Sequence, residues 1–151
     1  MDICFSLVVG AALVARLPSP VTLSWRHSVE HVLIEEEWTA SRQGLAMVSS
    51  STDGLGAGID IPDDARLVAN RWTFRPALAP QAQVQLANSR FALGYAVCWP
   101  GGCAQLVDLA GGWDRAVRMA LCDEDADGLA MPGARSVVYS RPEFHGSQRF
   151  R

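Results

Sequence analysis

The chain has 151 residues, of which 49% are hydrophobic and 19% charged, and its formal charge is -3 at pH 7. This length is enough to bury a core without a metal or a disulfide to hold it, so one domain is expected. The negative charge argues against a nucleic-acid partner, which needs a concentrated basic surface.

The N-terminal segment, residues 3–15, is a nearly unbroken run of apolar and small residues. It is shorter than the roughly 20 apolar residues that a membrane span needs, and Asp2 stands where a signal peptide carries positive charge. Gly10 predicts instead a buried hairpin of two strands, residues 3–9 and 11–17. A signal or anchor segment is the alternative, so the sequence leaves both a cytoplasmic and a periplasmic location open.

Most of the chain downstream alternates apolar and polar residues with a period of two, which favours strands over helices. Strands are expected at residues 21–25, 34–39, 45–48, 67–68, 72–74, 84–86, 91–98 and 103–109. Residues 113–121 alone have helical spacing. We therefore predict an all-β fold, a small antiparallel sandwich or partly closed barrel, with one short helix near residues 113–121. This single β domain is expected to occupy residues 1–122, followed by a loosely ordered C-terminal tail, residues 123–151.

Residues 27–31 match the pattern H-x-x-E-H of inverted zinc metalloproteases. In such a site two histidines on one helical face bind zinc, so the alternative function is a zinc-dependent hydrolase with His27, His31 and Glu36 as ligands and Glu30 as the base. The residues before the motif alternate as a strand, however, and the motif contains weak helix formers. We expect a strand, a turn and a second strand here, with no metal and no cofactor.

Two of the four cysteines, Cys98 and Cys103, flank a predicted turn at residues 99–102. They can form a cross-strand disulfide if their Cα atoms come within about 7 Å. An oxidising compartment favours that bond, and the cytoplasm favours two half-buried thiols. The spacing of the four cysteines does not indicate a disulfide scaffold.

Four segments together, LSWRHSVEHVLIEEEW, GAGIDIP, LANSRF and VCWPGGC, resemble the bacterial family known as domain of unknown function 1850. The resemblance extends from residue 3 to about residue 122. The family signature falls on His27, Ser28, Val29, Glu30, Glu35, Glu36 and Trp38, with Gly56, Ala57 and Gly58 in a small-residue loop. His31 departs from the lysine that is common at this place in the family.

The resemblance implies no established activity. Genes of this family often lie beside the membrane components of tripartite, solute-receptor-dependent transporters, which implies an accessory or ligand-binding part in solute uptake. We therefore expect a non-enzymatic accessory or small-anion-binding module, whose partner is a small anionic solute or a transporter subunit, with no integral membrane span. A purely structural protein that contacts a permease is a further alternative.

The expected binding site lies where the strand that ends at His27 meets the strand that carries the following carboxylates. A carboxylate hydrogen-bonded to His27 would raise the pKa of the imidazole and fix its tautomer. Closely spaced glycines can add backbone N–H groups that converge on an anion. The predicted ligand-binding residues are His27, Ser28, Glu30, Glu35, Glu36, Gly56 and Gly58.

Overall fold

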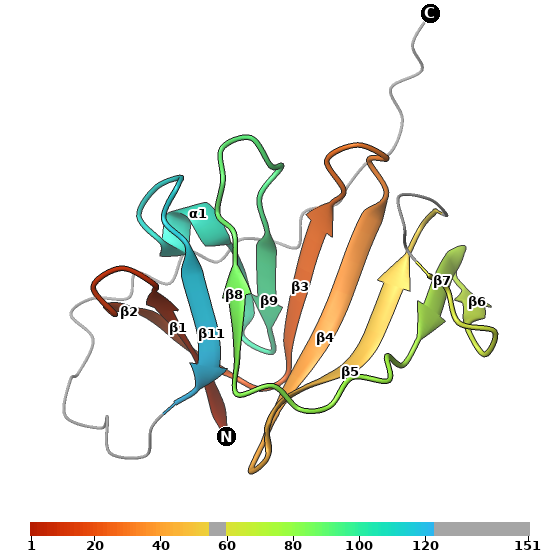
Figure 1. Ribbon diagram of the computed structural model, residues 1–151, viewed down its shortest axis with the longest axis horizontal. Helices are drawn as coiled ribbons and strands as arrows, with labels where there is room; N and C mark the ends of the chain where they lie inside the picture. Colours follow the sequence, from red (N-terminus) through yellow and green to blue (C-terminus); the bar gives the residue numbers. More distant parts are fainter. Residues whose placement is uncertain (55–59, 123–151) are drawn as a thin grey trace, which may run out of the picture.

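The computed structural model describes residues 1–54 and 60–122, so Gly56, Gly58 and the expected tail at 123–151 lie outside the described residues. The described chain forms two antiparallel sheets (Figure 1). The elements are β1 (Asp2–Leu7), β2 (Leu13–Pro18), β3 (Val21–Arg26), β4 (Leu33–Ser41), β5 (Gly44–Thr52), β6 (Arg66–Val68), β7 (Arg71–Phe74), β8 (Gln83–Leu86), β9 (Ala96–Trp99), β10 (Gly102–Gln105), α1 (Leu106–Leu109) and β11 (Val117–Leu121).

The predicted all-β class is confirmed, because the described residues form a sandwich-like pair of sheets with one short helix and no closed barrel. The predicted place of that helix is wrong. The helix is α1, and Val117–Leu121 is strand β11. Gly111, Gly112 and Asp114 have positive φ, which is incompatible with a right-handed helix that begins there, and β11 buries its alternate residues Val117 and Met119.

The four-stranded sheet has the order β2-β1-β11-β8. The N-terminal hairpin predicted from Gly10 is confirmed, since β1 and β2 pair antiparallel across a turn in which Gly10 and Ala11 have positive φ. Strand β1 lies between β2 and β11, and Ile3 and Phe5 are fully buried. Alternation of apolar and polar residues thus places one face of this sheet on the core.

The seven-stranded sheet has the order β10-β9-β3-β4-β5-β7-β6. We call its inner face the one that carries Val21, Leu23 and Trp38, which belong to the buried core. The opposite face is the outer face. Pairing of β3 with β4 sets Leu23 opposite Glu36 and Ser24 opposite Glu35, so successive residues of β4 lie on different faces.

Residues 75–82 carry the chain from β7 in the larger sheet to β8 in the smaller sheet. On the way Gln81 pairs with Leu45, and the N–H of each residue donates to the carbonyl of the other at 2.8 Å. In Figure 1, β5, β7 and β6 extend away from the four-stranded sheet. None of the helices in residues 1–54 and 60–122 has the length and apolar character needed to span a bilayer.

Candidate functional site

Residues 27–32 connect β3 to β4, and the side chain of His27 caps this turn. His27 Nδ1 accepts the backbone N–H groups of Val29 and Glu30, both at 3.3 Å. The N–H of His31 donates to the His27 carbonyl at 2.9 Å. An accepting Nδ1 is unprotonated, so the neutral ring carries its proton on Nε2. The turn backbone thus occupies Nδ1 of His27, whereas a carboxylate was expected to hydrogen-bond to this imidazole.

The expected strand-turn-strand arrangement is confirmed around the H-x-x-E-H motif. His31 has φ 55°, in the left-handed region, and its carbonyl accepts Arg26 Nη1 at 2.9 Å. The motif therefore lies in a turn, where the histidines are not presented by one helical face. Within the described ranges, no group of three or more His, Cys, Asp and Glu side chains is placed to hold a metal ion.

Replacing His27 by alanine is expected to lower the free energy of unfolding by about 1 kcal/mol, because two turn amides lose their acceptor. Asparagine places Oδ1 where the imidazole has Nδ1, so His27→Asn is expected to retain most of this stability. Urea denaturation of both variants measures the difference. Equal losses in the two variants would show that the cap is not what His27 contributes.

The predicted binding residues that lie in the described ranges are distributed over the β3–β4 turn and both faces of β4. Ser28 and Glu30 are exposed in the turn. Glu35 and Glu36 are adjacent on β4, so they lie on the outer and inner faces of the sheet respectively. Of this set, Glu36 alone combines a half-buried carboxyl group with aromatic neighbours on the inner face.

Glu35 belongs to a polar cluster that crosses the outer face, and sequence reasoning missed the other members of this cluster. Ser24 Oγ donates to Glu35 Oε1 at 3.3 Å, and Arg71 Nη2 lies 3.2 Å from Glu35 Oε2. Arg71 also donates to Ser51 Oγ from Nε at 3.2 Å and from Nη2 at 3.0 Å. These bonds connect β3, β4, β5 and β7, so we assign the outer-face cluster to holding the strands in register.

Glu36 lies on the inner face, opposite Leu23 of β3 and Ser50 of β5. Trp38 Nε1 donates to Glu36 Oε2 at 3.0 Å, and Trp38 itself is buried. Burial raises the pKa of the Glu36 carboxyl above its usual range, and the hydrogen bond from Trp38 opposes that rise. The protein thus keeps a partly desolvated carboxyl group on a face that carries mainly apolar and aromatic side chains.

Aromatic rings accompany Glu36 on the same face. The rings of Trp25 and Tyr95 lie 5.3 Å apart with their planes tilted by 50°. Burial raises the pKa of the Tyr95 hydroxyl, and the negative charge of Glu36 raises it further. Phe74 pairs with Ser50 in the register and therefore shares this face.

We call this set the inner-face patch: Trp25, Glu36, Ser50, Phe74 and Tyr95. Its aromatic members and Glu36 are half-buried, so they retain contact with solvent. Aromatic faces attract cations, and a carboxylate pairs with them directly. The chemistry of the inner-face patch therefore suits a cationic, hydrogen-bond-donating group rather than an anion.

The raised pKa of Glu36 predicts how stability changes with pH. In the unfolded chain this carboxyl ionises around 4.5 and in the folded chain at a higher pH. The stability that the fold gains from holding the Glu36 proton is fully present below pH 4.5, and it is lost as the pH rises through the pKa of Glu36 in the folded protein. Relative to Glu36→Gln, the unaltered protein should therefore lose stability as the pH rises from 4.5 toward neutral. Thermal unfolding over this range measures the difference, and a constant difference contradicts the assignment.

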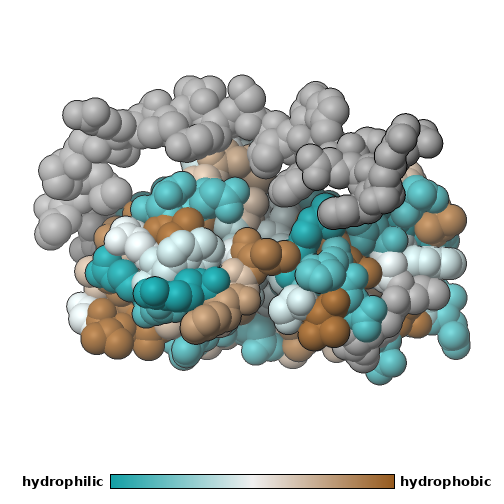
Figure 2. Space-filling model, turned by 90° about the horizontal axis from the view of Figure 1, so that it is seen from above, coloured by the Kyte–Doolittle hydropathy of each residue, from teal (hydrophilic) through white to brown (hydrophobic). Residues whose placement is uncertain are grey.

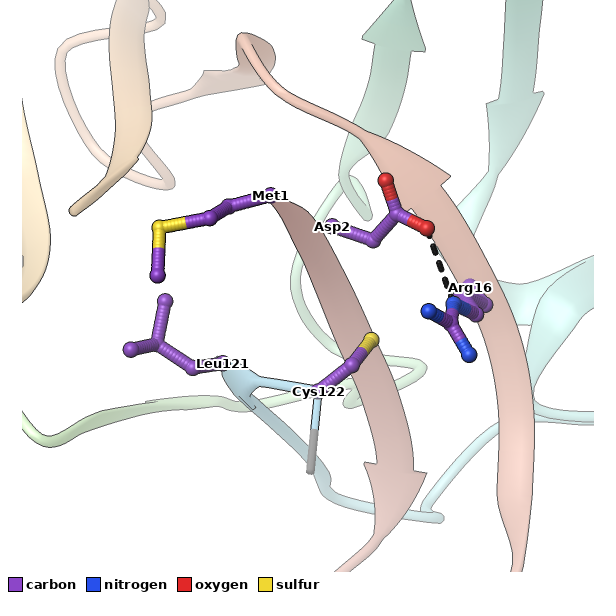
Figure 3. A pocket seen from close by; sticks show the side chains of 5 residues that line it. All are labelled: Met1, Asp2, Arg16, Leu121 and Cys122. Atoms are coloured by element: carbon purple, nitrogen blue, oxygen red, sulfur yellow. Dashed lines mark hydrogen bonds and ion pairs between the residues drawn. The ribbon is translucent and has the colours of Figure 1, made fainter. Parts of the chain in front are cut away.

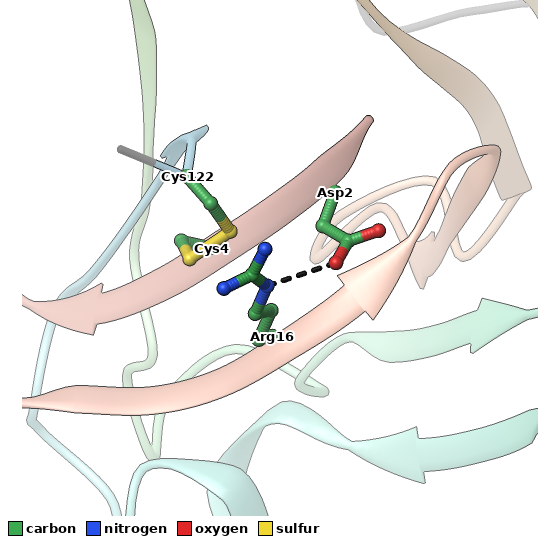
Figure 4. Close-up of a disulfide and its surroundings, with 4 residues drawn as sticks. All are labelled: Asp2, Cys4, Arg16 and Cys122. Atoms are coloured by element: carbon green, nitrogen blue, oxygen red, sulfur yellow. Dashed lines mark hydrogen bonds and ion pairs between the residues drawn. A yellow bond between two sulfur atoms is a disulfide. The ribbon is translucent and has the colours of Figure 1, made fainter. Parts of the chain in front are cut away.

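Two disulfides use the four cysteines of the chain. Cys98 and Cys103 face each other in the β9–β10 hairpin, with Cα atoms 4.0 Å apart, as the turn between them allowed. Cys4 and Cys122 join β1 to the end of β11 over a sequence separation of 118 (Figure 4). Sequence spacing did not indicate the second bond, because only the pairing of β1 with β11 brings these residues together.

A cavity of about 260 Å³ lies beside the Cys4–Cys122 bond, lined by Met1, Asp2, Arg16, Leu121 and Cys122 (Figure 3). Arg16 Nε donates to Asp2 Oδ2 at 2.8 Å within this lining. The cavity contains none of the residues expected to bind a ligand. We therefore place the candidate site at the inner-face patch.

In the comparison with protein families, the model described as "Domain of unknown function (DUF1850)" matches residues 21–106. The matched segment contains the His27 turn, Glu36 and the β9–β10 disulfide. Comparisons with curated proteins and with solved structures gave no match. Because the match covers more than half of the 151 residues, the chain belongs to the DUF1850 family.

Proposed function

We propose that this protein is a non-enzymatic binding module that holds a small solute at the inner-face patch through a cationic, hydrogen-bond-donating group. The proposal depends on one observation: the Glu36 carboxyl is partly buried among aromatic rings and accepts a hydrogen bond from Trp38. Keeping a carboxyl group there costs desolvation energy, which a cationic ligand would recover.

The same observation changes the charge expected of the ligand from negative to positive. The anion site predicted from sequence relied on His27 and on glycine amides, and the His27 Nδ1 atom is used by the turn. A carboxylate on the inner face would repel an anion.

An accessory part in solute uptake is supported by the family resemblance, which implies a link to tripartite transporters. The two disulfides add support for an oxidising compartment such as the periplasm, where such bonds persist. A periplasmic module that binds an amine-containing solute would fit both observations.

Calorimetric titration with butylammonium and with butyrate tests the proposal. The matched variants are Glu36→Gln and Glu37→Gln, since Glu37 is the next residue on β4, lies on the outer face and is exposed. We expect butylammonium to bind the unaltered protein and Glu37→Gln alike, and to bind Glu36→Gln at least about tenfold more weakly. Preference for butyrate, or equal binding by both variants, would contradict the proposal.

A further inference from the structure

The inner face of the seven-stranded sheet continues beyond the inner-face patch onto β7 and β6. Leu67 of β6 pairs with Trp72 of β7 in the register. Trp72 in turn pairs with Thr52 of β5, and Thr52 pairs with Ile34 of β4. Ile34 is two residues from Glu36, so the whole row lies on the side of the sheet that carries this carboxyl group. We call Ile34, Leu67 and Trp72, together with the inner-face patch, the open inner face.

The open inner face remains accessible at its β7 and β6 end. The four-stranded sheet does not lie over these two strands in Figure 1, and Leu67 is 58% exposed. Ile34 and Trp72 are half-buried, like Phe74 in the inner-face patch. Figure 2 views the loop end at the top of Figure 1, where apolar and hydrophilic residues are interspersed. The open inner face differs, because it carries mainly apolar and aromatic side chains around one carboxyl group.

The charge of Glu36 has no counterpart on the strands of this face. Among the described residues that the register of β3, β4, β5, β7 and β6 places on the inner face, none is a lysine or an arginine. Trp38 supplies one hydrogen bond to the carboxyl group and no positive charge. An occupant of this face should therefore combine apolar groups with a cation.

Such a combination is present in the sequence of the same chain, outside the described residues. Residues 128–151 contain four arginines and a single acid. Within them, residues 135–141 read RSVVYSR. In an extended chain alternate side chains share one side. Here that side would carry apolar and aromatic groups between two guanidinium groups, on Arg135, Val137, Tyr139 and Arg141.

We propose that residues 135–141 bind along the open inner face of their own chain, with an arginine on the Glu36 carboxyl. This inference rests on the proposed function, because it takes the cation of the inner-face patch to be one that the chain itself supplies. A guanidinium group suits the patch, since it can stack on an aromatic ring while it donates hydrogen bonds to a carboxylate. The segment would then compete with an amine-containing solute for the same site.

The chain is long enough for this contact. Cys122, at the end of β11, is fixed to β1 by its bond to Cys4. Arg135 is 13 positions after Cys122, and an extended chain covers about 3.3 Å per residue, or roughly 40 Å over this stretch. A compact domain of this length is roughly 35 Å across. A tethered segment also has a millimolar effective concentration, so a weak contact is enough to populate the bound form.

Two double variants of the full chain test the proposal. The test variant is Arg135→Gln with Arg141→Gln, and the matched control is Arg149→Gln with Arg151→Gln, which removes the same charge from the same segment. Trp38 Nε1 donates to Glu36 Oε2, so its indole N–H resonance reports on the carboxyl group. Without added ligand, we expect this resonance to move in the test variant and to stay unchanged in the control. By calorimetry, the test variant should bind butylammonium at least about threefold more tightly than the unaltered protein and the control.

An unmoved Trp38 resonance in the test variant overturns the inference, and so does an equal change in the two variants, which would show a general effect of charge. The inference and the proposed function fail separately. Equal binding of butylammonium by all three proteins would overturn the inference and leave the proposed function standing. If butylammonium bound none of them while the Trp38 resonance moved in the test variant alone, the inference would stand and the small-solute proposal would be wrong.

Discussion

Replacing both Cys4 and Cys122 by serine is expected to lower the free energy of unfolding by about 3 to 5 kcal/mol. The bond joins residues that are 118 positions apart, so it restricts nearly the whole described chain in the unfolded state. It also fastens β11 to β1 at the end of their pairing, where the Cys122 N–H donates to the Asp2 carbonyl at 3.2 Å. Guanidinium denaturation of the oxidised variant and the oxidised parent measures this difference.

The matched control is the variant with Cys98 and Cys103 replaced by serine. These residues are 5 positions apart, and the hairpin hydrogen bonds keep β9 and β10 together without the disulfide. The loss here should be about 2 kcal/mol or less, because a short loop has little closure entropy to lose. An equal or larger loss in this control would mean that chain closure does not explain the stability given by Cys4–Cys122.

Gly44→Ala is expected to destabilise the fold by about 3 kcal/mol or more. Gly44 begins β5 with φ 121°, and a Cβ atom at this position would lie 2.5 Å from the Gln81 carbonyl oxygen. That oxygen accepts the Leu45 N–H at 2.8 Å, so neither backbone can move without breaking the contact between β5 and residues 75–82. Thermal unfolding monitored by circular dichroism measures the loss.

Gly10→Ala is the control for the backbone angle alone. Gly10 has φ 84° in the β1–β2 turn, and a Cβ atom there would meet nothing within 4 Å. Gly10→Ala should destabilise the fold by about 1 kcal/mol, which is the strain of holding alanine in the left-handed conformation. If Gly44→Ala destabilised the fold no more than Gly10→Ala, the proposed clash between a Cβ atom at position 44 and the Gln81 carbonyl would be wrong.

Local patterns in the sequence predicted much of the fold because most strands bury one side of an alternating segment. The hairpins at residues 3–17 and around Asn70 follow from turn residues between apolar runs, and both are present. The prediction of a helix at residues 113–121 was wrong, because the apolar residues of a five-residue strand can also fit the spacing of a helix. Only the pairing of Val117–Leu121 with β1 and β8, which is not local, decides between them.

The candidate site was less predictable than the fold. Alternation along the strand expected at residues 34–39 puts Glu36 and Trp38 on one face and Glu35 on the other, yet the predicted site combined both glutamates. His27 was singled out for its chemistry, although its Nδ1 atom has a local use in the turn. Tyr95 was taken as part of a long strand, and its contact with Trp25 depends on β9 pairing with β3.

The most direct test of the central claim is to follow the Trp38 indole N–H resonance during a butylammonium titration. Trp38 Nε1 donates to Glu36 Oε2 at 3.0 Å, so a cation that pairs with this carboxyl must change the electronic environment of the bond. We expect the Trp38 indole resonance to shift with saturation in proton–nitrogen correlation spectra, together with that of Trp25 and without large changes at the amides of residues 27–32. Shifts confined to the turn, or an unmoved Trp38 resonance while butylammonium binds, would contradict the proposed site.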